Sequence, residues 1–163
     1  MVEDAWRVLG IVHEWVRHAE AKAGLCLAGA GFVGGALFQL VSGSDRQNEP
    51  LVQGLAATCA LWVCAACLCA GLSLWPRLRD RATPSSAIYF DHIARQHPGN
   101  GQAYVERLRT SLAEPESVLN EVGTQIWANA RVARRKFRWA GLALLTLLLA
   151  LATLGATAVA VII

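Results

Sequence analysis

Charged side chains are absent from three long stretches of this chain, and their absence decides which solvent those stretches prefer. Only 17% of the 163 residues are charged, whereas 55% are hydrophobic. The uncharged stretches cover residues 23–41, 54–75 and 139–163. Because a helix rises about 1.5 Å per residue, each stretch is long enough to cross a hydrocarbon core about 30 Å thick. A helix in a soluble bundle needs a polar face, which these stretches lack.

The chain is therefore predicted to be an all-α membrane protein with three transmembrane helices and a small helical cytoplasmic segment between the second and the third. In lipid, a helix satisfies its own backbone hydrogen bonds, so an uncharged helix is stable there. The expected order is an amphipathic cytoplasmic helix at 1–22, transmembrane helices at 23–41, 54–75 and 139–163, a periplasmic loop at 42–53 and a cytoplasmic helical sensing segment at 76–138.

The positions of the basic residues predict which ends face the cytoplasm. Eleven of the 15 lysine and arginine residues fall in 76–138, three precede the first span, and only Arg46 lies in 42–53. Cytoplasmic loops of membrane proteins carry the excess of basic residues. The N-terminus and 76–138 are therefore expected inside the cell, and the C-terminus in the periplasm. Trp75 and Trp139 stand at the expected cytoplasmic membrane surface, where tryptophan is enriched.

Motifs for catalysis, metal binding and phosphate binding are also absent. The turn at 98–101 lacks the spacing and the lysine of a glycine-rich phosphate loop. Asp91, His92 and His97 have no partner cluster that would make a metal site or an acid–base pair. No serine nucleophile motif or pair of catalytic carboxylates is visible, and a net charge of +3 is too small to indicate a nucleic-acid polymer as partner. We expect no enzyme activity, no cofactor and no metal.

Two helices are predicted to extend well beyond the membrane. Hydrophobic residues recur at spacings of three and four from Val2 to Val16, and no breaker separates this amphipathic helix from the first span. One helix is therefore expected to run through both. A second long helix is expected from Pro115 to the C-terminus, because proline suits the first turn of a helix and the last span has no breaker just before it.

Small residues four apart in the first span predict a close contact between helices. Gly24 and Ala28 form one such pair, and Gly31 and Gly35 form a G-x-x-x-G pair. Small side chains allow two helix backbones in a membrane to approach closely. The four residues are therefore a candidate assembly face. The pattern leaves open whether the partner is the second span, the third span or another subunit.

Four of the five cysteines lie in the second span, at Cys59, Cys64, Cys67 and Cys69. The spacing of Cys64 and Cys67 matches redox and zinc motifs, which would make the protein a membrane thiol oxidoreductase. No second pair of ligands is present, and a bilayer lacks the electropositive surroundings that lower the pKa of a thiol. We therefore expect these cysteines to act as small apolar side chains.

Two charged residues stand at the entry to the first span. Glu20 and Lys22 form either a gate or a contact with the cytoplasmic segment, or their side chains reach to the lipid headgroups.

Several short motifs, taken together and in order, resemble those of a bacterial membrane family. They are the A-E-x-K-A sequence at 19–23, the Y-F-x-H-I-A sequence at 89–94, Tyr104, Leu108, Gln125, Ala130 and the R-K-F-R sequence at 135–138. This pattern is similar to the transmembrane effectors of the Pycsar anti-phage system and covers nearly the whole chain.

The likeness implies an inner-membrane protein that works with a pyrimidine cyclase. The cyclase makes cyclic UMP or cyclic CMP on infection. The effector, expected to be a homo-oligomer, then impairs the inner membrane and the infected cell dies. The alternative is a non-toxic membrane adaptor that anchors a cytoplasmic partner protein.

A cyclic mononucleotide requires a cation for its phosphate and a flat side chain for its base. Candidates for the phosphate contact are Arg95, Arg107, Arg109, Arg134 and Arg135, and candidates for stacking on the base are Tyr89, Phe90 and Tyr104. Basic residues next to the spans also serve as topology signals and as contacts to lipid headgroups. The aromatic residues would equally suit the core of a small domain.

Overall fold

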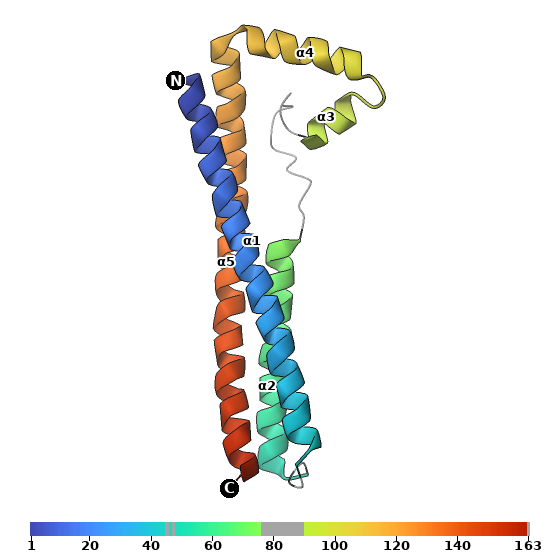
Figure 1. The fold of residues 1–163 in the computed structure, drawn as a ribbon, viewed down its shortest axis with the longest axis vertical. Coiled ribbons are helices and arrows are strands. Elements are labelled where there is room, and N and C mark those ends of the chain that lie inside the picture. The colour runs from blue at the N-terminus through green and yellow to red at the C-terminus, as the bar shows by residue number, and fades with distance from the viewer. Residues whose placement is uncertain (45, 47, 76–89, 163) are drawn as a thin grey trace. The chain divides into compact units, whose positions relative to one another are not determined.

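All secondary structure that the computed structural model describes is helical (Figure 1). The described residues are 1–44, 46, 48–75 and 90–162, and within them the side chains of residues 90–92 are excluded. The helices are α1 (Val2–Ser42), α2 (Pro50–Leu74), α3 (Phe90–Gln96), α4 (Gly101–Ala113) and α5 (Pro115–Ile162). The predicted all-α class is confirmed for these residues.

Three of the helices, α1, α2 and α5, are long and apolar enough to cross a membrane. This finding confirms the predicted multi-pass architecture, and the pieces between α2 and α5 are the short helices α3 and α4. The two predicted long helices are also confirmed. α1 is unbroken over 41 residues, and α5 is unbroken over 48 residues and begins at Pro115.

The chain packs as two compact units. The first unit comprises Met1–Arg17 and Pro76–Arg134, and the second comprises His18–Trp75 and Arg135–Ile163. Both α1 and α5 therefore contribute residues to each unit.

In the first unit, the beginning of α1 packs against the beginning of α5. Leu9 of α1 is buried together with Val118 and Val122 of α5, and Ile126 covers the same cluster. The buried residues Val118, Val122 and Gln125 of α5 recur at spacings of four and three, so they form one stripe of the helix. The amphipathic N-terminal part of α1 thus buries its apolar stripe against the beginning of α5. α4 directly precedes α5 in the sequence. Asn100 caps the start of α4, where its side-chain oxygen accepts a hydrogen bond of 3.0 Å from the Ala103 amide.

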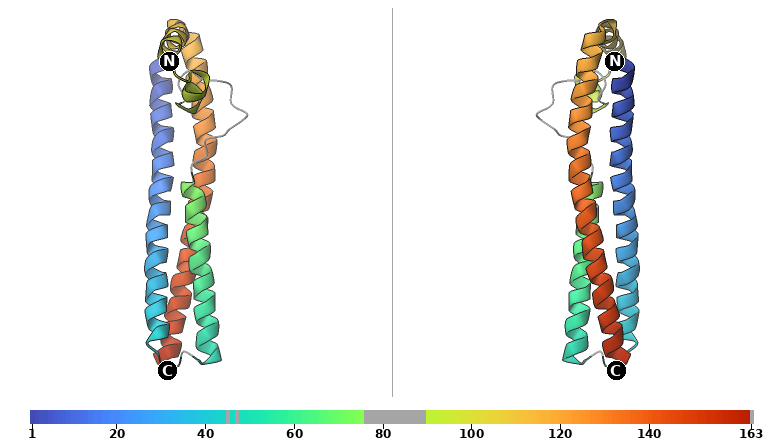
Figure 2. Two further views of the ribbon diagram at one scale, coloured as in Figure 1. Left: turned by 90° about the vertical axis from the view of Figure 1, so that its right-hand side faces the viewer. Right: turned by 90° about the vertical axis from the view of Figure 1, so that its left-hand side faces the viewer.

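In the second unit, segments of α1, α2 and α5 lie side by side (Figures 1 and 2). Their contacts are made largely by small residues, among which Ala30, Ala66 and Ala150 are completely buried. Val33 and Cys59 pack in the same core. Small side chains at the contacts are typical of helices that associate in a membrane, where close van der Waals packing replaces the hydrophobic effect.

The cysteines of α2 take part in this packing. The Cys59 thiol is buried and donates a hydrogen bond of 3.3 Å to the carbonyl oxygen of Ala150 on α5. Cys64 is exposed and Cys67 is half-buried, and both are free thiols. Cys59 thus behaves as a small polarizable side chain, as predicted for the cysteines of this span.

Replacing Cys64 and Cys67 together with serine is expected to leave the activity of the protein unchanged. Both cysteines lie in the uncharged stretch 54–75, which has no cationic side chain to activate a thiol, and serine has nearly the same volume. The measurement compares the double variant with the unaltered protein, at equal expression, for the membrane leakage that the family resemblance implies. The thiol oxidoreductase hypothesis would be supported by the opposite result: the double variant causes no leakage, and mild reductant also stops leakage by the unaltered protein.

Candidate functional site

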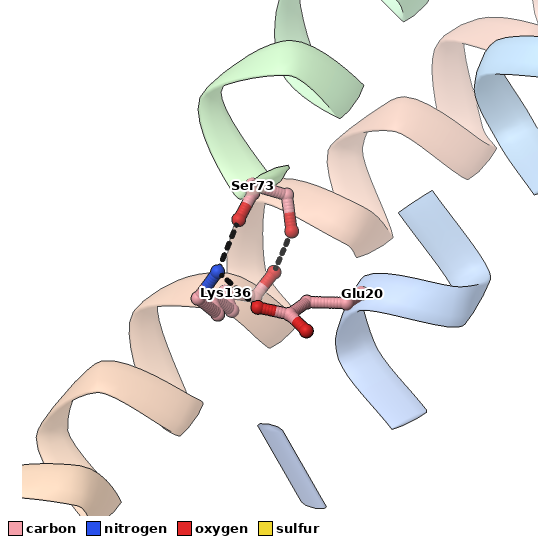
Figure 3. Close-up of polar contacts among 3 residues, drawn as sticks. All are labelled: Glu20, Ser73 and Lys136. Carbon is pink, nitrogen blue, oxygen red and sulfur yellow. Dashed lines mark hydrogen bonds and ion pairs between the residues drawn. The ribbon is translucent and has the colours of Figure 1, made fainter. Parts of the chain in front are cut away.

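A lysine joins all three helices of the second unit (Figure 3). The Lys136 Nζ of α5 donates a hydrogen bond of 2.8 Å to Glu20 Oε1 of α1, and one of 2.9 Å to the carbonyl oxygen of Ser73 on α2. In return, the Ser73 hydroxyl donates a hydrogen bond of 3.1 Å to the carbonyl oxygen of Lys136. We call Glu20, Ser73 and Lys136 the lysine clasp.

The position of Ser73 near the end of α2 explains why a cation is held there. α2 ends at Leu74, so the Ser73 carbonyl is among the last four of the helix and has no partner within it. These carbonyls also carry the negative end of the helix dipole. The Lys136 ammonium therefore satisfies an orphan acceptor and meets a favourable electrostatic potential at the same time.

Because the lysine clasp is partly buried, its contacts contribute more to stability than those of a surface ion pair. The Lys136 side chain is 13% exposed and the Glu20 side chain is 42% exposed. Ser73 is completely buried. An ammonium that is withdrawn from water is stable only when an opposite charge and acceptors replace its hydration. The carboxylate of Glu20 and the carbonyl of Ser73 supply both.

Lys22, two residues after Glu20 on α1, contacts Phe137, the residue that follows Lys136 on α5. Its Nζ lies 5.4 Å from the centre of the Phe137 ring. A cation at this distance from an aromatic face is attracted by the ring quadrupole, weakly when the site is open to water. Glu20 and Lys22 thus reach two successive residues of α5, Lys136 and Phe137.

The glycines of α1 fall into two sets that face different surroundings. A methyl group added at Gly29 would lie 3.0 Å from Leu147, and one added at Gly34 would lie 3.5 Å from Val63. These glycines pack inside the unit.

The candidate assembly face of α1 belongs to the other set. A methyl group added at Gly24, Gly31 or Gly35 would meet no atom of the described residues within 4 Å. Ala28, Gly31 and Gly35 are also exposed, and Gly24 is half-buried. Within the described part of this chain, neither α2 nor α5 covers this face.

The candidate nucleotide contacts are spread over three helices. Arg95 is exposed on α3, Arg107 and Arg109 are exposed on α4, and Arg134 and Arg135 are exposed on α5. Tyr104 of α4 is half-buried, and its ring centre lies 5.8 Å from that of His97. Tyr89 and the side chain of Phe90 lie outside the described residues. No group of three histidine, cysteine or acidic side chains in the described residues is placed to hold a metal ion.

Reasoning from the sequence did not single out Lys136 as the partner of Glu20. Lys136 lies within a run of basic residues at 134–138, and such a run is already explained as a signal for orientation in the membrane. The signal that could have distinguished it is its residue type. It is the single lysine of that run, and lysine carries its charge as a compact ammonium on a flexible stem.

Comparison with known proteins gives the family. The model of the Pycsar effector protein domain matches residues 4–163. A curated relative, the Pycsar effector protein PtPycTM of Propioniciclava tarda, is 30% identical over 156 residues, which cover 93% of this chain and 76% of the relative. No solved structure matches the chain. The match extends over both units and all three potential spans, so the chain belongs to the Pycsar effector protein family.

Proposed function

We propose that this protein is the membrane effector of a Pycsar antiviral defence system. A partner cyclase makes cyclic UMP or cyclic CMP on infection, and this nucleotide activates the effector in the cytoplasm. The active effector impairs the inner membrane, which ends the infection with the death of the cell. The proposal rests above all on one observation, the family match over 160 residues that include three helices able to span a membrane.

The topology proposed for this function follows the basic residues. The N-terminus and the segment between α2 and α5 face the cytoplasm, where a nucleotide made inside the cell would be met, and the C-terminus faces the periplasm. α5 contributes to both units, so a change in its packing in one unit is linked to the other by continuous helix. The nucleotide must bind the active arrangement more tightly than the resting one, because equal affinity would shift no population.

Membrane damage requires several subunits in this proposal. One subunit supplies three spans, which pack together through small residues such as Ala30, Ala66 and Ala150, and three helices are too few to enclose a pore. The face formed by Gly24, Ala28, Gly31 and Gly35 is the contact through which subunits associate, because small residues let helices of two subunits approach closely.

Dye release from liposomes tests the proposed function directly. Purified protein in liposomes is titrated with cyclic UMP, cyclic CMP and cyclic AMP. We expect release with one or both pyrimidine nucleotides and none with cyclic AMP, because the response depends on the base. Liposomes without protein serve as the control. If correctly inserted protein releases no dye with any nucleotide, the self-contained effector is wrong and the adaptor hypothesis gains support.

A further inference from the structure

A groove runs along one face of α5 in the first unit, where α5 is orange in Figure 1. Its volume is about 730 Å³, and it is open to solvent because one helix face alone lines it. The groove is lined by Glu116, Leu119, Asn120, Gly123, Thr124 and Trp127. These residues recur at spacings of three and four, so they share one face of the helix.

The lining side chains combine a flat apolar surface with hydrogen-bonding groups. The Trp127 side chain is an aromatic wall, and the residue is 53% exposed. The Thr124 hydroxyl donates a hydrogen bond of 2.9 Å to the carbonyl oxygen of Asn120, so its oxygen can still accept one. The side-chain amide of Asn120 offers both donors and an acceptor. A pyrimidine base has the matching properties, since it stacks through its face and forms hydrogen bonds through its edge.

Gly123 leaves space at the middle of the groove. A methyl group added there would meet no atom of the described residues within 4 Å. Glycine inside a helix is less favourable than alanine or leucine, so its presence here lowers the stability of α5 without a close packing contact that would require it. Gly123 therefore leaves this part of the groove without a side chain.

A cation lies over the ring of Trp127, one helical turn beyond the lining residues. The guanidinium of Arg131 is 4.7 Å from the centre of the Trp127 ring. The carboxylate of Glu116 lies toward the other end, near the start of α5. This polarity would direct an anionic phosphate toward Arg131 and a neutral base and ribose toward Asn120 and Thr124, because a guanidinium forms charge-assisted hydrogen bonds with phosphate.

We infer that the groove on α5 is the binding site for the pyrimidine cyclic nucleotide of the proposed function, on which this inference rests. The base stacks on Trp127 and forms hydrogen bonds with Asn120 and Thr124, and the phosphate contacts Arg131. This site differs from the arginines and tyrosines suggested by the sequence, because it lies on α5 alone.

Calorimetric titration of the full chain in nanodiscs with cyclic UMP and cyclic CMP tests the site. Gly123→Leu fills the groove and is expected to weaken binding at least about tenfold, because the ligand and the new side chain compete for one space. Trp127→Ala is expected to weaken binding about 5- to 150-fold, the contribution typical of a base stacked on an aromatic ring. Gly10→Leu is the matched control, since Gly10 lies in the same unit, is equally open and is outside the groove.

A change in folding cannot mimic the expected result for Gly123→Leu, because leucine is a better helix former than glycine. Helix content measured by circular dichroism should therefore stay the same or rise. A further titration compares the affinity for cyclic UMP, which carries a phosphate, with the affinity for uridine, which does not. Arg131→Gln is expected to reduce the preference for the charged ligand, because the phosphate loses its cation.

Two results would overturn the inference, and they are distinguishable. If the unaltered protein binds a pyrimidine nucleotide and Gly123→Leu and Trp127→Ala bind it equally well, the groove is not the site, while the proposed function stands. If the unaltered protein binds neither nucleotide and releases no dye, both the site and the proposed function are wrong.

Discussion

Lys136→Met is expected to lower the free energy of unfolding by about 2 kcal/mol. This value lies between the 0–1 kcal/mol of an exposed ion pair and the 3–5 kcal/mol of a fully buried one, because the lysine is nearly buried and Glu20 remains partly in water. The loss includes the bond to the Ser73 carbonyl, which is left without its donor. Thermal unfolding of the protein in nanodiscs, followed by circular dichroism, measures the effect.

A double-mutant cycle separates the ion pair from the rest of the clasp. Glu20→Gln alone should lower the free energy of unfolding less than Lys136→Met does, because the Glu20 side chain is 42% exposed and remains partly hydrated. The two changes together should cost less than their sum by about 1 kcal/mol, the coupling expected of groups in contact. Strict additivity would show that Glu20 and Lys136 do not interact, and would contradict the lysine clasp.

Gly31→Leu combined with Gly35→Leu is expected to abolish cell killing at equal expression. The two side chains would project from the open face of α1 and keep helices of neighbouring subunits apart. The expected loss in association is at least tenfold for each substitution, or about 1.4 kcal/mol. Cross-linking of the protein in membranes, together with survival of cells supplied with the activating nucleotide, provides the measurement.

Gly155→Leu is the matched control for the assembly face. Gly155 is an exposed glycine of α5, and a methyl group there also meets no described atom within 4 Å. The control variant should retain killing, because it adds one leucine side chain to an uncharged span at a place outside the proposed contact. If the Gly31 and Gly35 variants kill as efficiently as the control, the assignment of the assembly face is wrong.

The sequence by itself determined the three spans and the all-α class, because the exclusion of charge from lipid is a local property of each stretch. It also determined the two long helices, since Pro115 and the spacing of apolar residues from Val2 onward are read directly along the chain. These features depend on neighbouring residues and not on how the helices meet.

Only the tertiary structure decided which side chains touch. Glu20 has Lys22 close to it in sequence, but residues two apart point to different sides of a helix. Its partner is Lys136, which lies 116 residues away. The rotation of α1 about its axis also decided that Gly29 packs inside while Gly31 is open. Such choices follow from the combined packing of several helices, for which no single stretch of sequence contains the information.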